Sequence, residues 1–216
     1  MPTYRTEAII LKRKNFSESD KILTIFSQKK GKISVIVKGA RRLKSRKGGN
    51  LDLLNYCDLL IARGKNLDLV LEAQAKNSFL PLKKNLGKIS FAYLGCEIID
   101  LLSAEQVENN LLFSCLRSFL ENLSVEDNNF KQRLLLLSFQ LKVFNLLGFF
   151  SEILLTSKKE AKIAAKLIGN DFGKIIFFDI DKESLDRLEL IATKLFEEIA
   201  EKHSPSRNFI SLVQKQ

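Results

Sequence analysis

A run of basic side chains early in the chain is the feature of the sequence best suited to chemistry. Ten lysines and arginines and no acidic residue lie between Asp20 and Asp52, and four of the ten fall between Arg41 and Arg46. Cations without counter-charges can neutralise phosphates and release the counterions of a polyanion, so the run predicts a polyanion-binding loop. The ten residues are Lys21, Lys29, Lys30, Lys32, Lys38, Arg41, Arg42, Lys44, Arg46 and Lys47.

The positive charge is confined to the first part of the chain. Residues 1–80 contain 17 lysines and arginines against 7 acidic residues, whereas residues 81–216 contain 18 of each. The net charge of +10 therefore belongs to residues 1–80. A basic run can also be a solvated surface that only maintains solubility. Its clustering among turn-forming glycines and serines favours binding over that interpretation.

The sequence offers little for catalysis. A Ser-His-Asp or Cys-His mechanism requires a histidine, and the only one, His203, lies in a polar stretch near the end. Acidic pairs such as Glu197 and Glu198 fall on charged helix faces, where solvation accounts for them. No Gly-x-x-x-x-Gly-Lys-Ser/Thr motif for nucleotide phosphates is present. We therefore predict a protein that is not an enzyme and needs no cofactor.

The three cysteines, Cys57, Cys96 and Cys115, are widely spaced and set among apolar residues. This pattern is typical of reduced thiols in a core. A structural zinc site needs about four Cys or His ligands, usually with two in a close pair. The sequence has no such pair, so we predict no metal site.

The composition is that of an ordinary globular protein, with 45% hydrophobic and 28% charged residues. No apolar run approaches the roughly 18–20 residues of a membrane span. Residues 1–7 lack the apolar core and the small-residue cleavage site of a secretory signal. We therefore expect a cytoplasmic protein with no membrane partner.

The basic loop is expected to lie on a small β-barrel. Residues 1–80 show short strand patterns separated by turns, with a hairpin turn at Lys29-Lys30-Gly31-Lys32 and a long loop from Gly39 to Asn50. Five antiparallel strands with one long loop suit a closed barrel of the OB-fold type, although an SH3-like barrel fits the same pattern. The expected strands are Tyr4–Lys14, Lys21–Ser27, Ile33–Lys38, Tyr56–Arg63 and Leu67–Lys76.

Two details of the barrel follow from the residue pattern. The alternation is clearest in the fifth strand, where apolar residues at every second position from Leu67 to Ala75 are predicted to share one face. Aromatic rings in a barrel can stack on nucleic-acid bases, although most of those available here also suit the core. The candidates are Tyr4, Phe16, Phe26, Tyr56 and Phe79.

Near Pro81 the apolar period changes from two to about 3.6, so we place a domain boundary there and expect a helical domain over residues 81–216. The chain is then an α+β protein. Ser103 and Gln106 form a capping box that predicts the start of the second helix. The third helix, over residues 130–147, is rich in leucine and is expected at the centre of a bundle, ending at Gly148. Further helices are expected over residues 89–99, over residues 158–168 and after Asp181.

Several segments resemble those of a known family. Glu18-Ser19-Asp20, Gly31-Lys32-Ile33-Ser34 and the stretch from Lys38 to Arg46 resemble the N-terminal barrel of the bacterial DNA repair protein RecO family. Gly39-Ala40-Arg41-Arg42 is part of the most specific of these matches. The similarity continues through residues 93–97 to residues 205–209, so it spans most of the chain.

The resemblance implies a mediator of recombinational DNA repair in the cytoplasm, associated with the nucleoid. Such a protein binds single- and double-stranded DNA, anneals complementary strands without ATP and works with RecR to load RecA onto strands coated by single-strand-binding protein. Its helical domain would contact the C-terminal tail of single-strand-binding protein. The DNA contacts would come from Lys38, Arg41, Arg42, Lys44 and Arg46, with Lys29, Lys30, Lys32 and Lys47 as further candidates.

The sequence departs from the family in one respect. Many members carry a four-cysteine zinc site after the third helix, whereas residues 151–178 contain no cysteine. We expect packing to take over the structural role of the zinc.

Other functions fit the basic loop. Cations directed at the backbone do not distinguish RNA from DNA, so an RNA-binding or ribosome-associated barrel protein is a second hypothesis. An adaptor whose loop docks onto an acidic protein tail is a third. A small nuclease is the least favoured, because the basic domain lacks a carboxylate cluster for a divalent metal.

Overall fold

The computed structural model describes residues 2–40, 49–150 and 157–200. Contacts divide the chain into two compact units. Met1–Phe79 and Ser103–Phe113 form the first unit, and Leu80–Leu102 and Ser114–Gln216 form the second. The segment Ser103–Phe113 therefore belongs with the strands. Among the described residues, no helix combines the length and the apolarity that crossing a bilayer requires.

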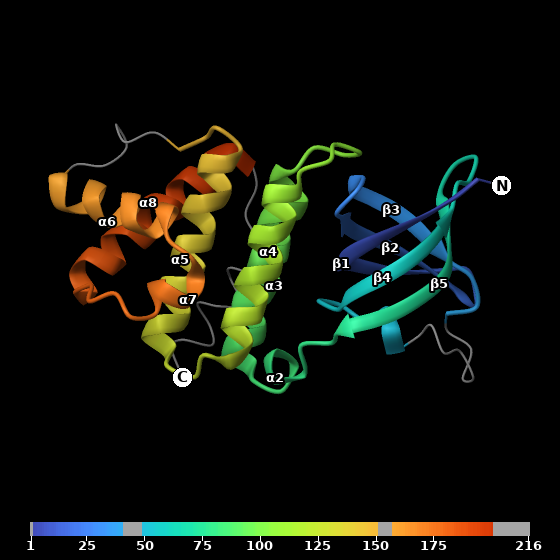
Figure 1. The fold of residues 1–216 in the computed structure, drawn as a ribbon, viewed down its shortest axis with the longest axis horizontal. Helices are drawn as coiled ribbons and strands as arrows, with labels where there is room; N and C mark the ends of the chain where they lie inside the picture. The colour runs from blue at the N-terminus through green and yellow to red at the C-terminus, as the bar shows by residue number, and fades with distance from the viewer. Residues whose placement is uncertain (1, 41–48, 151–156, 201–216) are drawn as a thin grey trace. The chain divides into compact units, whose positions relative to one another are not determined.

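Five strands form a closed barrel in the first unit, which confirms the predicted α+β fold with an N-terminal barrel (Figure 1). The order around the ring is β1-β2-β3-β5-β4. β3 and β5 run parallel, so the prediction of an entirely antiparallel barrel was wrong. Strand directions cannot alternate all the way around a ring of five, and one pair must be parallel. The strands are β1 (Thr3–Phe16), β2 (Asp20–Ser27), β3 (Gly31–Val37), β4 (Tyr56–Ala62) and β5 (Asp68–Asn77).

The inward faces of the strands form the barrel core. In β3, Ile33, Val35 and Val37 are buried and alternate with more exposed residues, as a period of two requires. Ala40 and Leu51 pack in the same core. The chain on both sides of the basic loop is thus anchored inside the barrel.

β5 departs from the alternation that its sequence predicts. Leu60 pairs with Glu72 whereas Ile61 pairs with Val70, so the register shifts at this point. Val70 takes the core position and is 0% exposed, while Leu71 is half-buried. The apolar residues at alternate positions from 67 to 75 therefore do not share one face, because the bulge changes the phase of the strand.

Aromatic rings join the segment Ser103–Phe113 to the outside of the barrel. Tyr56 and Phe26 flank Ile9 in one cross-strand row. The Phe113 ring centroid lies 6.2 Å from that of Phe26 and 6.3 Å from that of Tyr56. The rings of Phe26 and Phe113 are both buried. Phe113 therefore closes a second apolar layer on the outer face of the strands.

The predicted capping box at residues 103–106 does not start a helix. Gln106 has a φ of +59°, and its amide donates to the carbonyl of Lys32 at 2.9 Å. The helix starts only at Asn110. In its first turn the amide of Leu112 donates a hydrogen bond to the side-chain oxygen of Asn109 at 2.9 Å. Glu105 and Gln106 pair with Lys32 of β3 instead, so backbone groups that would have bonded within a longer helix are satisfied by the barrel.

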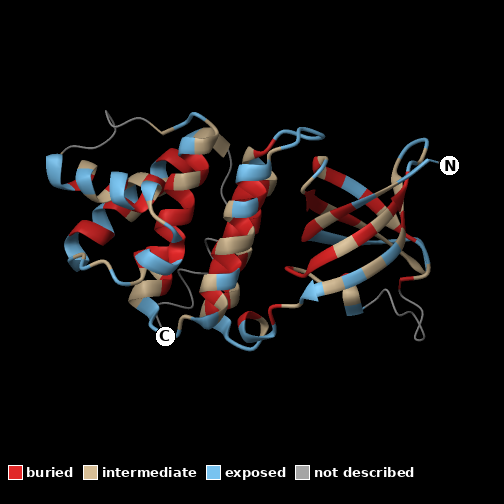
Figure 2. Ribbon diagram, in the orientation of Figure 1, coloured by how far each residue is buried: buried red, intermediate tan, exposed pale blue. Residues whose placement is uncertain are grey.

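The second unit is helical, and α5 lies at its centre. Eleven of the 18 residues of α5 are buried, and it packs against α3, α6, α7 and α8 (Figure 2). Gly148 directly follows the C-cap residue Leu147. The predicted central position and the predicted end of this helix are both confirmed. The helices are α2 (Leu80–Lys83), α3 (Leu86–Leu102), α4 (Asn110–Val125), α5 (Asn129–Leu146), α6 (Lys158–Gly169), α7 (Phe172–Ile175) and α8 (Lys182–Ala200).

Two basic side chains join α5 to its neighbours. The ammonium of Lys142 donates to the carbonyls of Ile168 and Asn170 at 2.6 and 2.7 Å, and burial lowers the pKa of this lysine. The Nε of Arg133 donates to Glu189 of α8 at 3.0 Å, and hydrogen bonding to that carboxylate raises the pKa of the arginine. These contacts satisfy carbonyls at the end of α6 and position α8.

The start of α8 predicts a pH dependence of stability. Asp181 accepts hydrogen bonds from the Lys159 ammonium at 2.7 Å and from the Ser184 amide at 2.9 Å, and these bonds, led by Lys159, lower its pKa. The carboxylate therefore stabilises the folded protein above its ordinary pKa of about 3.9, and the contribution is lost as the pH falls. We expect Asp181→Asn to flatten the dependence of the melting temperature on pH between about pH 2 and 5.

The exposed neighbour Asp179 provides the control for this measurement. Asp179→Asn removes one carboxylate close to the same helix without removing the cap. An equal flattening in both variants would contradict the assignment to Asp181.

Candidate nucleic-acid interface

The outer face of β1, β2 and β3 carries two rows of side chains that the register defines. Thr24 lies opposite both Lys12 and Ser34. In the next row, Ile22 lies opposite both Lys14 and Ile36. Directly opposed residues point to the same face of a sheet. The face therefore combines two lysines with two half-buried aliphatic side chains.

A bulge in β1 places these lysines on the outer face. Ile10 pairs with Ile25, but Lys12 pairs with Thr24, so the strand contains one extra residue at Leu11. In a regular strand Leu11 would have paired with Thr24, and Lys12 would have pointed inward. The extra residue reverses the inward–outward alternation of β1, so each side chain after Leu11 points to the face opposite the one it would have had in a regular strand. The sequence run Lys12-Arg13-Lys14 did not reveal this, because a bulge has no reliable local signature.

The cations of the barrel differ in whether an acidic group already neutralises them. Three are paired, through Arg5–Asp58, Arg13–Asp52 and Lys76–Glu7 contacts. Lys14 and Lys38 are exposed and form no ion pair with any residue in the described ranges. These two are the described cations of this face best placed to receive an external phosphate.

Backbone geometry holds Lys38 at the entrance to the basic loop. Lys38 directly follows β3, and the amide of Gly39 donates to the Asp20 carboxylate at 2.9 Å. Asp20 opens β2 and pairs with Phe16 at the end of β1. The residues leading into the basic loop therefore lie beside the β1–β2 turn. The predicted contacts Arg41, Arg42, Lys44, Arg46 and Lys47 lie outside the described residues.

The three predicted lysines of the β2–β3 turn lie at the other end of the hairpin. Ser27 pairs with Gly31 at the turn, whereas Lys21 pairs with Val37 at the far end. The length of β3 corresponds to roughly 20 Å. Lys29 is exposed, and Lys30 and Lys32 are partly buried. Cations that are continuous in the sequence thus occupy two separate places on the barrel.

The structure separates the candidate stacking residues. Phe26, Tyr56 and Phe79 are buried. The Tyr4 hydroxyl donates to Asp68 at 2.7 Å, and burial, together with this bond, raises the pKa of the tyrosine. Phe16 is 48% exposed at the end of β1. Of the five candidates, Phe16 is the one whose ring is open to a base.

The described residues contain no group of three or more His, Cys, Asp or Glu side chains that could hold a metal ion. Cys57 and Cys96 are buried, and Cys115 is partly buried. Burial raises the pKa of the Cys96 and Cys115 thiols to about 12. These two thiols are therefore protonated at neutral pH.

Comparisons with known proteins give a consistent result. Residues 1–79 match the family described as Recombination protein O N terminal, and residues 83–153 match the family described as Recombination protein O C terminal. The chain is 37% identical over 121 residues to DNA repair protein RecO of Roseiflexus sp. (strain RS-1), covering 56% of this chain and 42% of the relative. It is 32% identical over 150 residues to DNA repair protein RecO of Dehalococcoides mccartyi (strain CBDB1), covering 69% of this chain and 58% of the relative. The match thus spans about half the length of these relatives.

Proposed function

This chain belongs to the RecO family of DNA repair and recombination proteins, and from that membership we propose that it binds DNA through its barrel and anneals complementary strands without ATP. The observation that supports this most directly is the outer face of β1–β3. Lys14 and Lys38 are available there beside half-buried aliphatic side chains and the exposed ring of Phe16. The basic loop starts and ends at the same barrel. The proposal includes no catalytic residue and no cofactor.

Such a surface can promote annealing by simple electrostatics. Two complementary strands repel each other through their phosphates, and bound cations reduce that repulsion. Contacts to the backbone carry no sequence information and leave the base edges free to pair. The side chains that we assign to DNA are Lys38, Arg41, Arg42, Lys44 and Arg46, followed by Lys29, Lys30, Lys32 and Lys47. To these we add Lys12, Lys14 and Phe16, which are exposed on the outer face of the barrel.

We also propose the partners that family membership implies. With RecR, the protein would help to load RecA onto single strands coated by single-strand-binding protein in the cytoplasm. The helical unit would meet the tail of single-strand-binding protein. It offers exposed apolar side chains, and Phe177, which is 79% exposed, lies 5.8 Å from the Lys131 ammonium.

Annealing in the absence of nucleotide tests the function. We expect the full chain to accelerate pairing of two dye-labelled complementary oligonucleotides in buffer without ATP or divalent metal. A matched RNA strand that competes as well as DNA would support the RNA-binding alternative. Cleavage of the strands would indicate a nuclease, and no acceleration would favour an adaptor.

The salt dependence of binding tests the two exposed lysines. We expect the double variant Lys14→Gln, Lys38→Gln to bind single-stranded DNA with a shallower plot of log K against log salt. Each lost phosphate contact lowers the slope by about 0.7 for single strands. The control is Lys84→Gln, Lys162→Gln, which removes two exposed lysines of the helical unit. A slope that matches the wild type would exclude Lys14 and Lys38 from the contact surface.

A further inference from the structure

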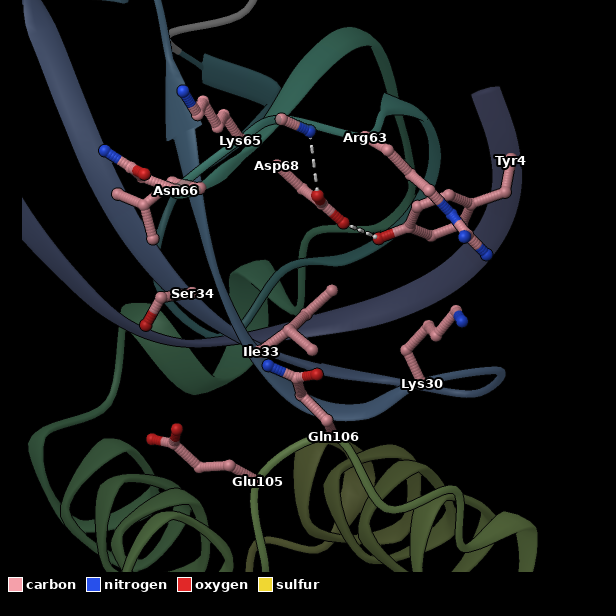
Figure 3. A pocket seen from close by; sticks show the side chains of 12 residues that line it. Tyr4, Lys30, Ile33, Ser34, Arg63, Lys65, Asn66, Asp68, Glu105 and Gln106 are labelled. Atoms are coloured by element: carbon pink, nitrogen blue, oxygen red, sulfur yellow. Dashed lines mark hydrogen bonds between the residues drawn. The ribbon is translucent and has the colours of Figure 1, made fainter. Parts of the chain in front are cut away.

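A polar cleft lies on the barrel and shares one residue, Ser34, with the rows of the outer face. Its volume is about 550 Å³, which is within the roughly 300–1,000 Å³ of small-ligand pockets. The turn between β4 and β5 forms one wall, and β3 and the segment Ser103–Phe113 contribute to the rest (Figure 3). All of these elements belong to the first unit. We propose that this cleft binds one unpaired nucleotide, base and phosphodiester, of a single DNA strand bound to the barrel.

The turn between β4 and β5 is held rigidly in shape. A side chain at Gly64 would bring its Cβ to 1.8 Å from the carbonyl oxygen of Leu67, so only glycine fits. The Gly64 amide donates to Asp68 at 3.1 Å, and the second carboxylate oxygen accepts the Tyr4 hydroxyl. Asp68 thus uses both oxygens internally. The wall that carries Arg63 and Lys65 is therefore organised before any ligand binds.

The charges in the cleft suit a ligand with a single negative charge. Lys30, Arg63 and Lys65 contribute three cations, against the two carboxylates of Asp68 and Glu105. The excess is one positive charge, which matches one phosphodiester. An acidic peptide with several carboxylates would meet repulsion from Glu105, which is exposed at the cleft.

The neutral side chains suit a base. Ser34 and Asn66 lie on the side of the cleft away from Tyr4, where a hydroxyl and an amide can meet the edge of a base (Figure 3). Lys30 and Arg63 lie on the Tyr4 side, and the Lys30 ammonium is 5.8 Å from the Tyr4 ring centroid. Ile33 adds apolar lining. A base already paired in a duplex is stacked and its Watson–Crick edge is occupied, so the cleft favours single strands.

The cleft is continuous with the proposed DNA-binding face. Ser34 lines the cleft and also lies opposite Thr24 in the row that contains Lys12. A strand that crosses this row therefore reaches the cleft without leaving the barrel. The inference rests on the proposed function, because it concerns the path of the same strand.

Abasic substitution combined with Asn66→Ala tests the proposal in the full chain. The probe is an oligonucleotide with normal bases and its counterpart with abasic sites, each measured by fluorescence anisotropy. We expect Asn66→Ala to weaken binding of the normal strand by about three- to tenfold, as the loss of one or two hydrogen bonds does. Binding of the abasic strand and of duplex DNA should not change.

A matched variant separates the cleft from the remaining surface. Gln74 is an exposed amide residue of β5 that does not line the cleft, and Gln74→Ala is expected to bind every probe like the wild type. As a second readout, a photoreactive thymine in the strand should crosslink to the peptide that contains Lys65 and Asn66.

Each outcome bears on the proposal. Wild-type affinity of Asn66→Ala for the normal strand, with crosslinks confined to other peptides, would overturn the nucleotide site and leave the proposed function intact. If Asn66→Ala instead weakened binding of a polyglutamate peptide alone, the cleft would be a peptide site. Absence of DNA binding by the wild type would overturn the proposed function and this inference together.

Discussion

The triple variant Arg41→Glu, Arg42→Glu, Arg46→Glu is expected to bind single-stranded DNA at least about 100-fold more weakly than the wild type at physiological salt. Each replaced arginine no longer releases a counterion from the DNA, and the new glutamate repels the phosphates. The loss of DNA affinity therefore exceeds that caused by neutral substitutions. Annealing without nucleotide should be lost in parallel. Fluorescence anisotropy at several salt concentrations measures the effect.

A charge-matched control distinguishes this loop from the overall charge. Lys158, Lys162 and Lys166 are exposed on α6 of the helical unit. Their triple replacement by glutamate changes the net charge by the same amount, and we expect it to lower affinity much less. Normal binding by the loop variant would refute the assignment of these arginines. The fold should survive, because Ala40 and Leu51 anchor the chain on either side of the loop in the core.

Phe113→Ala is expected to destabilise the barrel by about 3–5 kcal/mol, the usual cost of removing a buried phenylalanine. Phe113 is 1% exposed and packs against Phe26 and Tyr56. The variant therefore opens a cavity over the outer row of β1, β2 and β4. Urea unfolding followed by tyrosine fluorescence measures the change, because Tyr56 lies at the site.

Phe177→Ala is the control for the loss of an aromatic ring. Phe177 is 79% exposed, and its replacement should change the free energy of unfolding by less than about 0.5 kcal/mol.

A related test removes everything after Phe79. We expect that fragment to be unstable, because it lacks the segment that covers Phe26 and Tyr56. A stable fragment, or a Phe113→Ala protein as stable as the wild type, would contradict the role of the segment.

The strands and helices were predictable because their signals are local. Alternation in β3 and the leucine-rich pattern of α5 depend on neighbouring residues, and both appear in the structure where they were expected. The capping box at Ser103 and Gln106 failed for the opposite reason. Its residues suit a helix start, but pairing with Lys32 of β3 is a contact between segments distant in the sequence.

Part of the candidate interface was also predictable. Lys38 directly follows β3 at the entrance to the basic loop. Its contact with DNA stays a prediction, as do the contacts of the five loop cations beyond it. Lys29, Lys30 and Lys32 are continuous with Lys38 in the basic run but lie at the far end of the hairpin. Lys12 and Lys14 were missed, since their place on the outer face depends on one extra residue in β1.

The sequence by itself determined the confinement of the positive charge to residues 1–80 and the order of strands before helices. These properties depend on composition and on short-range periodicity. The tertiary structure decided which lysines share a face, which strand pair is parallel and that Ser103–Phe113 returns to the barrel. Bulges, ring closure and long-range packing depend on energies summed over distant segments, so no local pattern specifies them.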